Sequence, residues 1–321
     1  MKILVTGGMG VIGSMVCERL VGIGFRPVVM ARHLDRSLIG PIEEKLDVEL
    51  GDVVDFPRLA SIIKAQDITH IIHMAALIGA LSHQNPPASV QVNVVGTLNI
   101  LEAARLFGIR RVVYTSAKGV YGHIEGEYGH PAYTPITEDH PKNPIRIYDS
   151  EKLMGEHMGQ FYRRTFGVEF AALRFSGTFG PGKTVRHGGK AALSRLVEGA
   201  FAKKTVVIEK GGDQKTDYVY NRDAAEGVCL ACCAERLDHT AYNIGSAILA
   251  SLKDFAREIK RVLPDAEIEV GPGISEEWPN YNCLYDISRA RADLGYSPHF
   301  TVARAIEDYI EVLGRIASKS S

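Results

Sequence analysis

A glycine-rich segment near the amino terminus constrains the fold of this 321-residue chain more than any other feature. The segment TGGMGVIG (residues 6–13) follows the apolar run ILV (3–5) and opens an apolar helical pattern. Glycines at this spacing permit a tight turn between strand and helix, and they let the backbone approach a diphosphate closely. The amino terminus of the helix then faces the negative charge. The residues expected to hold such a diphosphate are Gly7, Gly10, Val11, Ile12 and Gly13.

Strands and helices alternate over the first 175 residues, which predicts a parallel sheet with helices on both faces. The strand segments are almost continuous apolar runs, as is typical of strands buried on both faces. We therefore expect an α/β fold in which residues 1–175 form a doubly wound, dinucleotide-binding Rossmann domain. The expected strands are 2–6, 26–30, 46–50, 69–73, 110–115 and 168–174, and the expected helices are 11–22, 55–65, 88–108 and 148–167.

The rhythm changes after residue 175. Residues 177–190 contain five glycines and a proline, which predicts a loop. We expect residues 176–321 to form a smaller α/β lobe that mainly binds substrate, with part of the chain returning to the sheet. Its expected helices lie near 190–202, 221–235, 251–263 and 301–316, and its expected strands near 205–208, 241–244 and 267–270.

Charge and composition exclude several classes of partner. Lysine and arginine number 37 against 38 aspartates and glutamates, so the basic surplus of a nucleic-acid-binding protein is missing. No apolar run approaches the roughly 18 residues of a membrane span. The start of the chain does not resemble a signal peptide, and the five cysteines are an odd number. We therefore expect a cytoplasmic protein with reduced thiols.

The end of the second strand indicates which dinucleotide binds. A site for NAD usually has an acidic residue there, which accepts hydrogen bonds from the ribose 2′-hydroxyl. In this chain the position holds Ala31, and Arg32 follows. Arginine suits a 2′-phosphate, and Arg36 keeps the neighbourhood of Asp35 basic. We therefore expect NADP, with NAD as the alternative. The structural alternative for Arg32 is a solvated side chain on a loop, which would not contact the cofactor.

Tyr148 and Lys152 form the candidate catalytic pair. They are four residues apart at the start of a helical pattern, so they share one face of the helix. A nearby ammonium favours phenolate over phenol and is expected to lower the pKa of the tyrosine towards that of a useful general base. This spacing is common by chance, but downstream of a dinucleotide motif it is far more specific.

With these motifs in place, the chain resembles the extended short-chain dehydrogenase/reductase family, in its NAD-dependent epimerase/dehydratase branch of the UDP-galactose 4-epimerase type. The resemblance covers nearly the whole chain, and its motifs occur in the expected order and spacing. The matching segments are TGGMGVIG (6–13), GDVVD (51–55), HMAAL (73–77), VNVVGTLNIL (92–101), VVYTSAKGVYG (112–122), YDSEK (148–152), LRFSGTFGPG (173–182) and DYVYNRDAAEGV (217–228).

The resemblance implies a role for individual residues. Asp52 would bond the adenine amino group, and Asn93 would fix a helix and a water near the catalytic group. Tyr148 would act as the acid and base, and Lys152 would be its partner and hold the nicotinamide ribose. The resemblance also implies a homodimer built from the helices 88–108 and 148–167. Further residues expected to line the cofactor cleft are Val53, Met74, Ala75, Ala76 and Phe175.

The chain departs from the family at a hydroxyl that usually polarises the substrate oxygen. The family has Ser or Thr three residues before its VYG motif, whereas this chain has Ala117. Ser116 and Thr115 carry hydroxyls, but neighbouring residues of an extended strand point to opposite sides. A kink beyond the strand could turn Ser116 towards the substrate, so we include Ser116 among the candidate catalytic residues; otherwise Tyr148 works with less help.

Two further departures concern the substrate. Nucleotide-sugar enzymes of this family commonly have Asn where this chain has Gly177, and Arg where it has Thr216. Lys215 could replace the arginine as a point charge. The segments 122–147 and 178–190 are long loops at the sheet edge where ligands bind. The second contains Lys183, Arg186, His187 and Lys190, which favours an anionic substrate unless the loop is simply solvated.

Other candidate residues favour structural roles. Cys229, Cys232 and Cys233 include a CxxC spacing, but it lies in an apolar helical stretch without a second ligand pair, so we expect buried thiols and no metal site. His73 follows the fourth strand and is expected to be structural. The aromatic residues that could contact either substrate or core are Trp278, Tyr281 and Tyr285.

Together these observations predict an NAD(P)-dependent oxidoreductase. It would transfer a hydride at a carbinol or carbonyl of a small sugar-like or hydroxy-acid substrate. The main alternative is an epimerase or dehydratase of nucleotide sugars, which regenerates its cofactor where a dehydrogenase consumes it. A minor alternative is a non-catalytic cofactor-binding protein, which only Ala117 supports.

Overall fold

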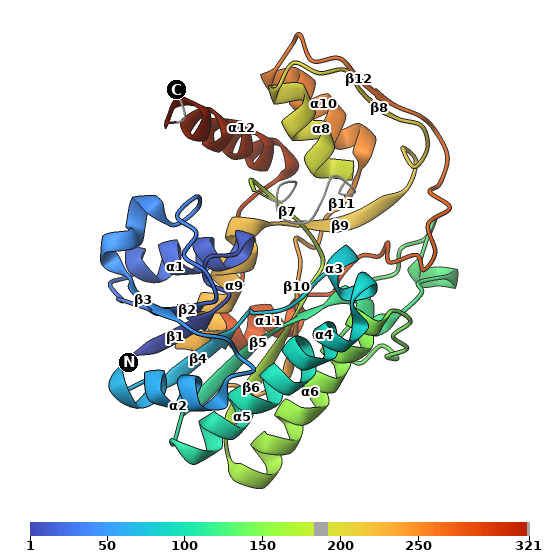
Figure 1. Ribbon diagram of the computed structural model, residues 1–321. Coiled ribbons are helices and arrows are strands. Elements are labelled where there is room, and N and C mark those ends of the chain that lie inside the picture. Colours follow the sequence, from blue (N-terminus) through green and yellow to red (C-terminus); the bar gives the residue numbers. More distant parts are fainter. Residues whose placement is uncertain (183–191, 320–321) are drawn as a thin grey trace.

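The centre of the molecule is a seven-stranded parallel sheet in the larger, lower lobe of Figure 1. We analysed a computed structural model, which describes residues 1–182 and 192–319. Six strands come from the first 175 residues and the seventh from the second half of the chain. They are β1 (Ile3–Thr6), β2 (Val28–Ala31), β3 (Asp47–Leu50), β4 (His70–His73), β5 (Arg111–Ala117), β6 (Glu169–Phe175) and β10 (Ala241–Ile244).

The strands lie in the order β10-β6-β5-β4-β1-β2-β3, and each pair of neighbours is parallel. The direction of winding reverses between β1 and β4, because the chain moves outward from β1 to β3 and then returns to β4 on the other side. Ligands of such sheets bind at the carboxyl ends of the strands beside this reversal. The predicted doubly wound sheet is therefore confirmed.

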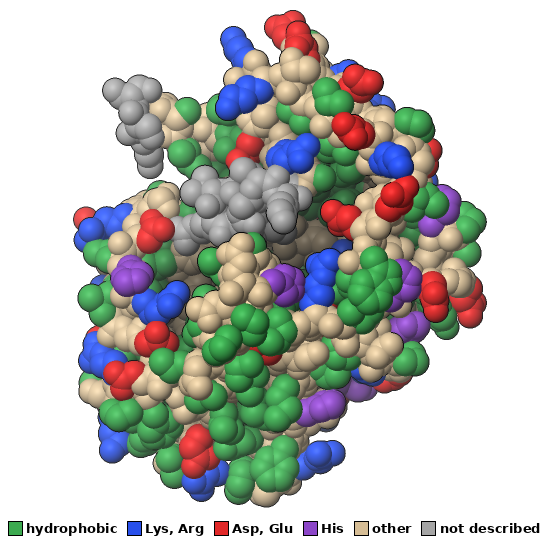
Figure 2. Space-filling model, turned by 45° about the vertical axis from the view of Figure 1, so that its right-hand side comes forward, with side chains coloured by type: hydrophobic (Ala, Val, Ile, Leu, Met, Phe, Trp, Pro, Cys, Tyr) green, Lys and Arg blue, Asp and Glu red, His purple; other side chains and the backbone are tan. Residues whose placement is uncertain are grey.

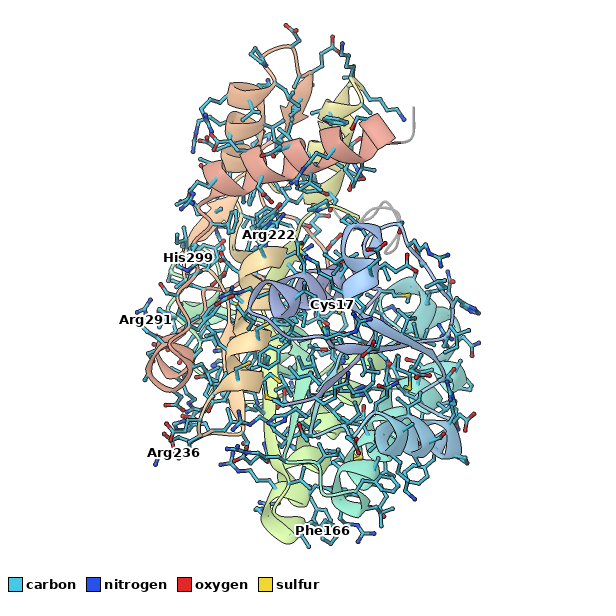
Figure 3. All side chains as sticks on the ribbon, turned by 90° about the vertical axis from the view of Figure 1, so that its left-hand side faces the viewer. Cys17, Phe166, Arg222, Arg236, Arg291 and His299 are labelled. Atoms are coloured by element: carbon cyan, nitrogen blue, oxygen red, sulfur yellow. The ribbon has the colours of Figure 1, made fainter. Side chains whose placement is uncertain are left out.

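Helices cover both faces of the sheet, and each strand alternates its side chains between two apolar clusters. Val5 packs into one cluster and Leu4 into the other. In Figure 3, α1 and α9 run side by side, with Cys17 on α1 and Arg222 at the start of α9. One face is covered by α1 (Val11–Gly22), α9 (Asn221–Cys233) and α11 (Ser288–Leu294), and the other by α2 (Phe56–Ala65), α5 (Gly96–Leu106) and α6 (Ile147–Phe166).

A smaller lobe stands above the carboxyl edge of the sheet (Figure 1) and has an apolar cluster of its own. Its elements are α8 (Ala192–Phe201), β8 (Val206–Ile208), α10 (Leu252–Val262), β12 (Ile268–Val270) and α12 (Val302–Lys319). A three-stranded sheet connects the two lobes, in the order β11-β9-β7. Its strands are β7 (Gly177–Phe179), β9 (Lys215–Tyr220) and β11 (Leu249–Ser251).

Two predicted segments differ from the structure. The helix expected over 88–108 is divided into α4 (Pro86–Val90), a π-helical turn (Gln91–Val95) and α5. The segment expected to be a loop from residue 177 begins instead with strand β7, which pairs with β9 from about forty residues further along the chain. Within the described residues, no helix has the length and apolar character needed to cross a membrane.

Candidate active site

A cleft of about 520 Å³ lies at the carboxyl edge of the sheet, beside the reversal between β1 and β4. Figure 2 shows this side of the molecule, with a hollow between the lobes and basic and histidine side chains at its edge. All but one of the residues that the sequence singled out for the cofactor or catalysis line this cleft. They are Gly7, Gly10, Val11, Ile12, Gly13, Arg32, Asp52, Val53, Met74, Ala75, Ala76, Ser116, Tyr148, Lys152 and Phe175.

The glycine-rich turn forms a cradle that a side chain would fill. Gly7 has φ of +70°, and a Cβ there would lie 2.8 Å from the backbone nitrogen of Ala75. A Cβ on Gly13 would lie 2.2 Å from the carbonyl oxygen of Gly7. Gly10 precedes α1 without a side-chain cap, and the first turn of α1 has no acidic residue. The first N–H groups of α1 are therefore available for a diphosphate, and the cradle fits a dinucleotide.

Thr6 joins the ends of β1 and β4 beneath this cradle. Its hydroxyl accepts hydrogen bonds from the backbone nitrogens of Met74 and Ala75, at 3.2 Å each. It also bonds Nδ1 of the buried His73 at 2.7 Å, and His73 Nε2 bonds the Thr97 hydroxyl at 3.0 Å. Burial lowers the pKa of His73 to about 3, so the ring is neutral and structural.

Tyr148 and Lys152 lie one turn apart on α6, as the sequence predicts, and both face the cleft. Nζ of Lys152 is 5.6 Å from the centre of the Tyr148 ring and donates a 2.7 Å hydrogen bond to the carbonyl oxygen of Thr115. Burial lowers the pKa of Lys152 to about 7. Lys152 is therefore tied to the end of β5, next to Tyr148 on the same helix.

The pKa of Tyr148 departs from the sequence argument. Burial, followed by the charges of Asp149 and Glu151, raises the pKa of the phenol above its ordinary value. The sequence argument expected the ammonium of Lys152 to lower it. Because desolvation also disfavours the charged form of Lys152, that ammonium is itself weakened as a stabilising charge. Without cofactor and substrate, Tyr148 is therefore a proton donor rather than a base.

The two hydroxyls beside Ala117 are engaged elsewhere. The Ser116 hydroxyl donates a 2.6 Å hydrogen bond to Oε1 of the buried Glu156, and the Thr115 hydroxyl donates to the carbonyl oxygen of His73 at 3.3 Å. Glu156 forms a buried ion pair with Arg174 at 2.6 Å. A kink that would turn the Ser116 hydroxyl towards the substrate is not present, because β5 remains extended through Ala117. The catalytic assignment of Ser116 stays a prediction.

Asn93 is the predicted cofactor residue that does not line the cleft. It lies on the π-helical turn, buried, and its amide bonds both the N–H and the carbonyl of Leu77 at 2.8 Å. The same amide donates to Oε2 of Glu151 at 2.7 Å. Asn93 thus ties the segment after β4 to α6, one layer behind the cleft wall.

The residues at the end of β2 stand as the sequence expects. Ala31 and Arg32 both line the cleft, and the Arg32 side chain is exposed with no hydrogen bond or ion pair to any described residue. Asp35 also lines the cleft, but its carboxylate accepts hydrogen bonds from the backbone and hydroxyl of Ser37. Arg36 is paired with Glu43.

The substrate side of the site is described only in part. Thr216 is buried, and its hydroxyl bonds the backbone of Cys283. A Cβ on Gly177 would lie 2.9 Å from the Tyr218 ring, so the backbone packs too closely for a larger residue there. Lys215 is exposed. The basic residues Lys183, Arg186, His187 and Lys190 lie outside the described residues.

The structure adds two cleft residues that the sequence reasoning missed. Lys118 follows Ala117, and Asn221 begins α9. Asn221 is fully buried, and neither its Oδ1 nor its Nδ2 has a partner among the described residues. A polar or charged residue at each position inside an otherwise matching motif was the available signal. Both residues lie inside segments that carry the family resemblance, VVYTSAKGVYG and DYVYNRDAAEGV.

None of the remaining candidate residues lines the cleft. Cys229 and Cys232 are buried, but Cys233 is exposed, which corrects the expectation of three buried thiols. No described group of three histidine, cysteine or acidic residues could hold a metal. Tyr285 is in the core, Trp278 is 66% exposed, and the Tyr281 hydroxyl donates to Asp149.

Comparison with known proteins agrees with this geometry. The sequence profile of the NAD dependent epimerase/dehydratase family matches residues 3–245. The chain is 31% identical over 327 residues to a UDP-glucose 4-epimerase of Mycolicibacterium smegmatis, covering 97% of this chain and 98% of the relative. It superposes on Thermotoga maritima UDP-glucose 4-epimerase, solved with UDP-glucose, with a TM-score of 0.87 at 23% identity, covering 99% of this chain and all of that one.

A second solved structure, with higher identity, is UDP-glucuronic acid 4-epimerase from Bacillus cereus in complex with UDP-glucuronic acid and NAD. Its identity to this chain is 25% and its TM-score 0.81, with 98% of this chain and all of that one covered. The profile spans residues 3–245, the relative and the two solved structures span nearly the whole chain, and all agree with the sequence resemblance. The chain therefore belongs to the NAD-dependent epimerase/dehydratase family and is an NAD(P)-dependent enzyme of the extended short-chain dehydrogenase/reductase type.

Proposed function

We propose that the protein oxidises a carbinol of the sugar in a nucleotide sugar and then returns the hydride, as a 4-epimerase does. The observation that carries this proposal is the placement of Tyr148 and Lys152 in a cleft whose other end fits a diphosphate. The names of the full-length relatives support the nucleotide sugar as substrate, so among the functions that the sequence left open we favour the epimerase.

The residues present would hold a dinucleotide along the whole cleft. The N–H groups at the start of α1 would bind its diphosphate. Asp52 and Val53 would contact the adenosine half, and Met74, Ala75 and Ala76 the middle. NAD or NADP, when bound, supplies the acceptor and donor of the hydride. Phe175 and Lys152 would contact the nicotinamide half, and Asn221 would gain partners for its unpaired amide.

Tyr148 would be the general acid and base. In its phenolate form, which the charge of Lys152 would favour, Tyr148 would take the proton from the substrate hydroxyl as the carbon is oxidised. The resulting phenol would return the proton to the carbonyl oxygen on reduction. The raised pKa of Tyr148 favours the second step, in which it donates. Lys152 would orient the ribose and counter the charge of the phenolate. For Ser116 to polarise the substrate oxygen, its hydroxyl would have to leave Glu156, to which it donates in this structure.

We propose NADP as the cofactor, with NAD as the alternative. Ala31 offers no carboxylate to a ribose, and Arg32 lines the cleft without a partner among the described residues. The NAD in the Bacillus cereus structure supports the alternative. Residues 1–175 would bind the dinucleotide and residues 176–321 mainly the substrate.

We also propose a cytoplasmic homodimer. All five cysteines are free thiols, which is typical of a reducing compartment. Leu98 on α5 and Met154 and Phe161 on α6 are 40–48% exposed, and α5 packs against α6. Figure 2 shows hydrophobic side chains gathered on this lower side of the molecule. An exposed apolar helix pair of this kind is suited to a second copy of the chain.

Cofactor stoichiometry tests the proposed reaction. Purified protein is supplied with UDP-glucose and either dinucleotide, and the sugar configuration is followed by NMR alongside the absorbance of reduced nicotinamide. An epimerase inverts the sugar over many turnovers without net cofactor reduction. A dehydrogenase, which Gly177 and Thr216 favour as the second candidate, reduces one cofactor for each sugar oxidised. That result would replace the first proposal with the second.

A further inference from the structure

Lys118 occupies an unusual place in the cleft. It follows Ala117, where the family's hydroxyl is missing, and begins a 3-10 turn (Lys118–Tyr121) at the carboxyl end of β5. Both Ala117 and Lys118 line the cleft together with Tyr148.

The turn that carries Lys118 is fixed against the catalytic helix. A Cβ on Gly119 would lie only 1.9 Å from Oδ1 of Asp149, so this glycine lets the carboxylate of Asp149 sit on the backbone of the turn. Asp149 is the neighbour of Tyr148 and is buried. The turn that begins at Lys118 is therefore held next to the start of α6, where Tyr148 lies.

The ammonium of Lys118 has no hydrogen bond or ion pair to any described residue. The acidic groups around it are Asp149, Asp217 and Glu277, and the thiol of Cys283 is also near. Asp149 already accepts the Tyr281 hydroxyl. Burial lowers the pKa of Lys118 despite these charges, which means that its charge is poorly solvated.

The carboxylate of Asp217 is occupied as well. It accepts hydrogen bonds from the backbone and hydroxyl of Ser246 and from the backbone of Ala247, at 2.8–3.0 Å. A poorly solvated ammonium that faces a cleft is stabilised by an anion that enters it. Two of the three nearby carboxylates are thus engaged by other donors, and the Lys118 side chain, which lines the cleft, can meet an anion that enters it.

The cofactor does not supply this anion. Its diphosphate belongs at the start of α1, after β1, and β5 is separated from β1 by β4. Strands are spaced by about 4.8 Å, so the two ends lie about 10 Å apart. The nicotinamide half, which would lie near Tyr148, carries no negative charge on its ring.

We propose that Lys118 binds a carboxylate on the sugar of the substrate, next to the reacting carbon, so that the enzyme prefers a uronic-acid sugar to a neutral hexose. This inference rests on the proposed function, because it names the substrate class of the same site. Lys118 lines the same cleft as Ala117 and Tyr148, so a group that it binds would lie on the sugar that Tyr148 acts on.

The test compares two ligands that differ only in this group, UDP-glucuronic acid and UDP-glucose, with UDP as the reference. Their affinities for the cofactor-loaded enzyme are measured by calorimetry, together with kcat/KM for both sugars. The proteins are the wild type, Lys118→Met, Lys118→Arg and the control Lys210→Met. Lys210 is exposed and paired with Glu276, outside the cleft. Melting temperatures confirm that each variant folds.

We expect the wild type to bind UDP-glucuronic acid at least about tenfold more tightly than UDP-glucose. Lys118→Met should weaken the uronic acid about 10- to 100-fold, while UDP-glucose and UDP change by less than about threefold. Lys118→Arg should retain part of the preference, and Lys210→Met should retain all of it.

Three results would overturn the inference. Equal affinity of the wild type for the two sugars would do so whether or not the variants fold, and would leave the proposed function intact. Equal weakening of both sugars and UDP in Lys118→Met would mean that Lys118 holds the nucleotide diphosphate instead. If the wild type bound none of the three nucleotides, the proposed function itself would fail, and this inference with it.

Discussion

Single residues decide the chemistry of this cleft by where their polar atoms point. Ser116 and Ala117 illustrate this, because one step along β5 turns the hydroxyl of Ser116 to Glu156 and leaves the cleft wall with a methyl group. The alternation of a strand predicts this outcome. The unpaired state of Lys118 could not be predicted, because it depends on which donors and carboxylates from distant segments surround it.

Ala31 and Arg32 are expected to determine which dinucleotide binds. We expect Ala31→Asp combined with Arg32→Ala to move the preference from NADP towards NAD. The change supplies a carboxylate for the ribose and removes a charge-assisted contact, which is equivalent to a factor of about 10 to 100 in affinity. Dissociation constants of both dinucleotides for wild type and variant measure the change. Wild-type protein that binds NAD as tightly as NADP would show that Arg32 makes no contact with the cofactor.

Replacing Asn221 should affect the stability of the cofactor-free protein and its affinity for the dinucleotide in opposite directions. Its buried amide has no partner among the described residues, and an unsatisfied buried polar group costs about 1–3 kcal/mol. Asn221→Leu should therefore leave the cofactor-free protein as stable or more stable, and weaken dinucleotide binding. Thermal unfolding with and without cofactor separates the two effects. Loss of stability without cofactor, or unchanged affinity for it, would remove Asn221 from the cofactor site.

The sequence predicts a helix or strand well when the pattern that specifies it is local. The strands of the central sheet are continuous apolar runs, and all six expected in the first 175 residues are present within two residues of their predicted bounds. Strands β7, β9 and β11 were not expected, because each is short and exists through pairing with distant segments. The π-helical turn was missed because its cause is also distant: Asn93 reaches Leu77 and Glu151.

His73 joins β4 to β1 and α5 and makes stability depend on pH. Its pKa is about 3 in the folded chain and about 6.5 when unfolded. Between these pH values the unfolded chain binds a proton that the folded chain does not. The free energy of unfolding therefore has its full value, as far as His73 is concerned, above pH 6.5, and it decreases as the pH falls towards 3. From pH 7 to 5 it amounts to about 2 kcal/mol.

We expect His73→Gln to be less stable than wild type at pH 7, because the bonds to Thr6 and Thr97 are altered. It should nevertheless lose about 2 kcal/mol less between pH 7 and 5. Urea unfolding at the two pH values measures this difference, and His157→Gln, at an exposed position on α6, is the control. An unchanged pH slope in His73→Gln would show that the buried ring is not responsible.

At the scale of the whole molecule, two lobes enclose the cleft and one apolar face remains exposed. The lower lobe provides the glycine cradle and the candidate catalytic pair, and the upper lobe stands over the carboxyl edge of the sheet. Nearly all the residues that the sequence motifs single out for a cofactor line the cleft, because they lie within a few residues of the strand ends. The motifs say less about the side next to β7, where Thr178 and Asn221 line the cleft, because its neighbours come from distant segments.

The exposed face predicts the oligomeric state. Wild-type protein should be a dimer by light scattering at micromolar concentration, and Met154→Glu combined with Phe161→Glu should be a monomer, because charges on that face would have to be desolvated. Leu50→Glu, at another exposed apolar residue, at the far edge of the sheet on β3, should remain a dimer. A monomeric wild type, or a dimeric double variant, would contradict the proposed interface.

The turnover of Tyr148→Phe tests the account most directly. The ring keeps its packing, and only the hydroxyl that moves the proton is lost. We predict that conversion of the nucleotide sugar falls by about 10²- to 10⁴-fold, while the affinity for the dinucleotide stays within a few-fold of wild type. Retention of more than about a tenth of the wild-type rate, with cofactor bound, would show that another group performs the acid–base step and would contradict the mechanism.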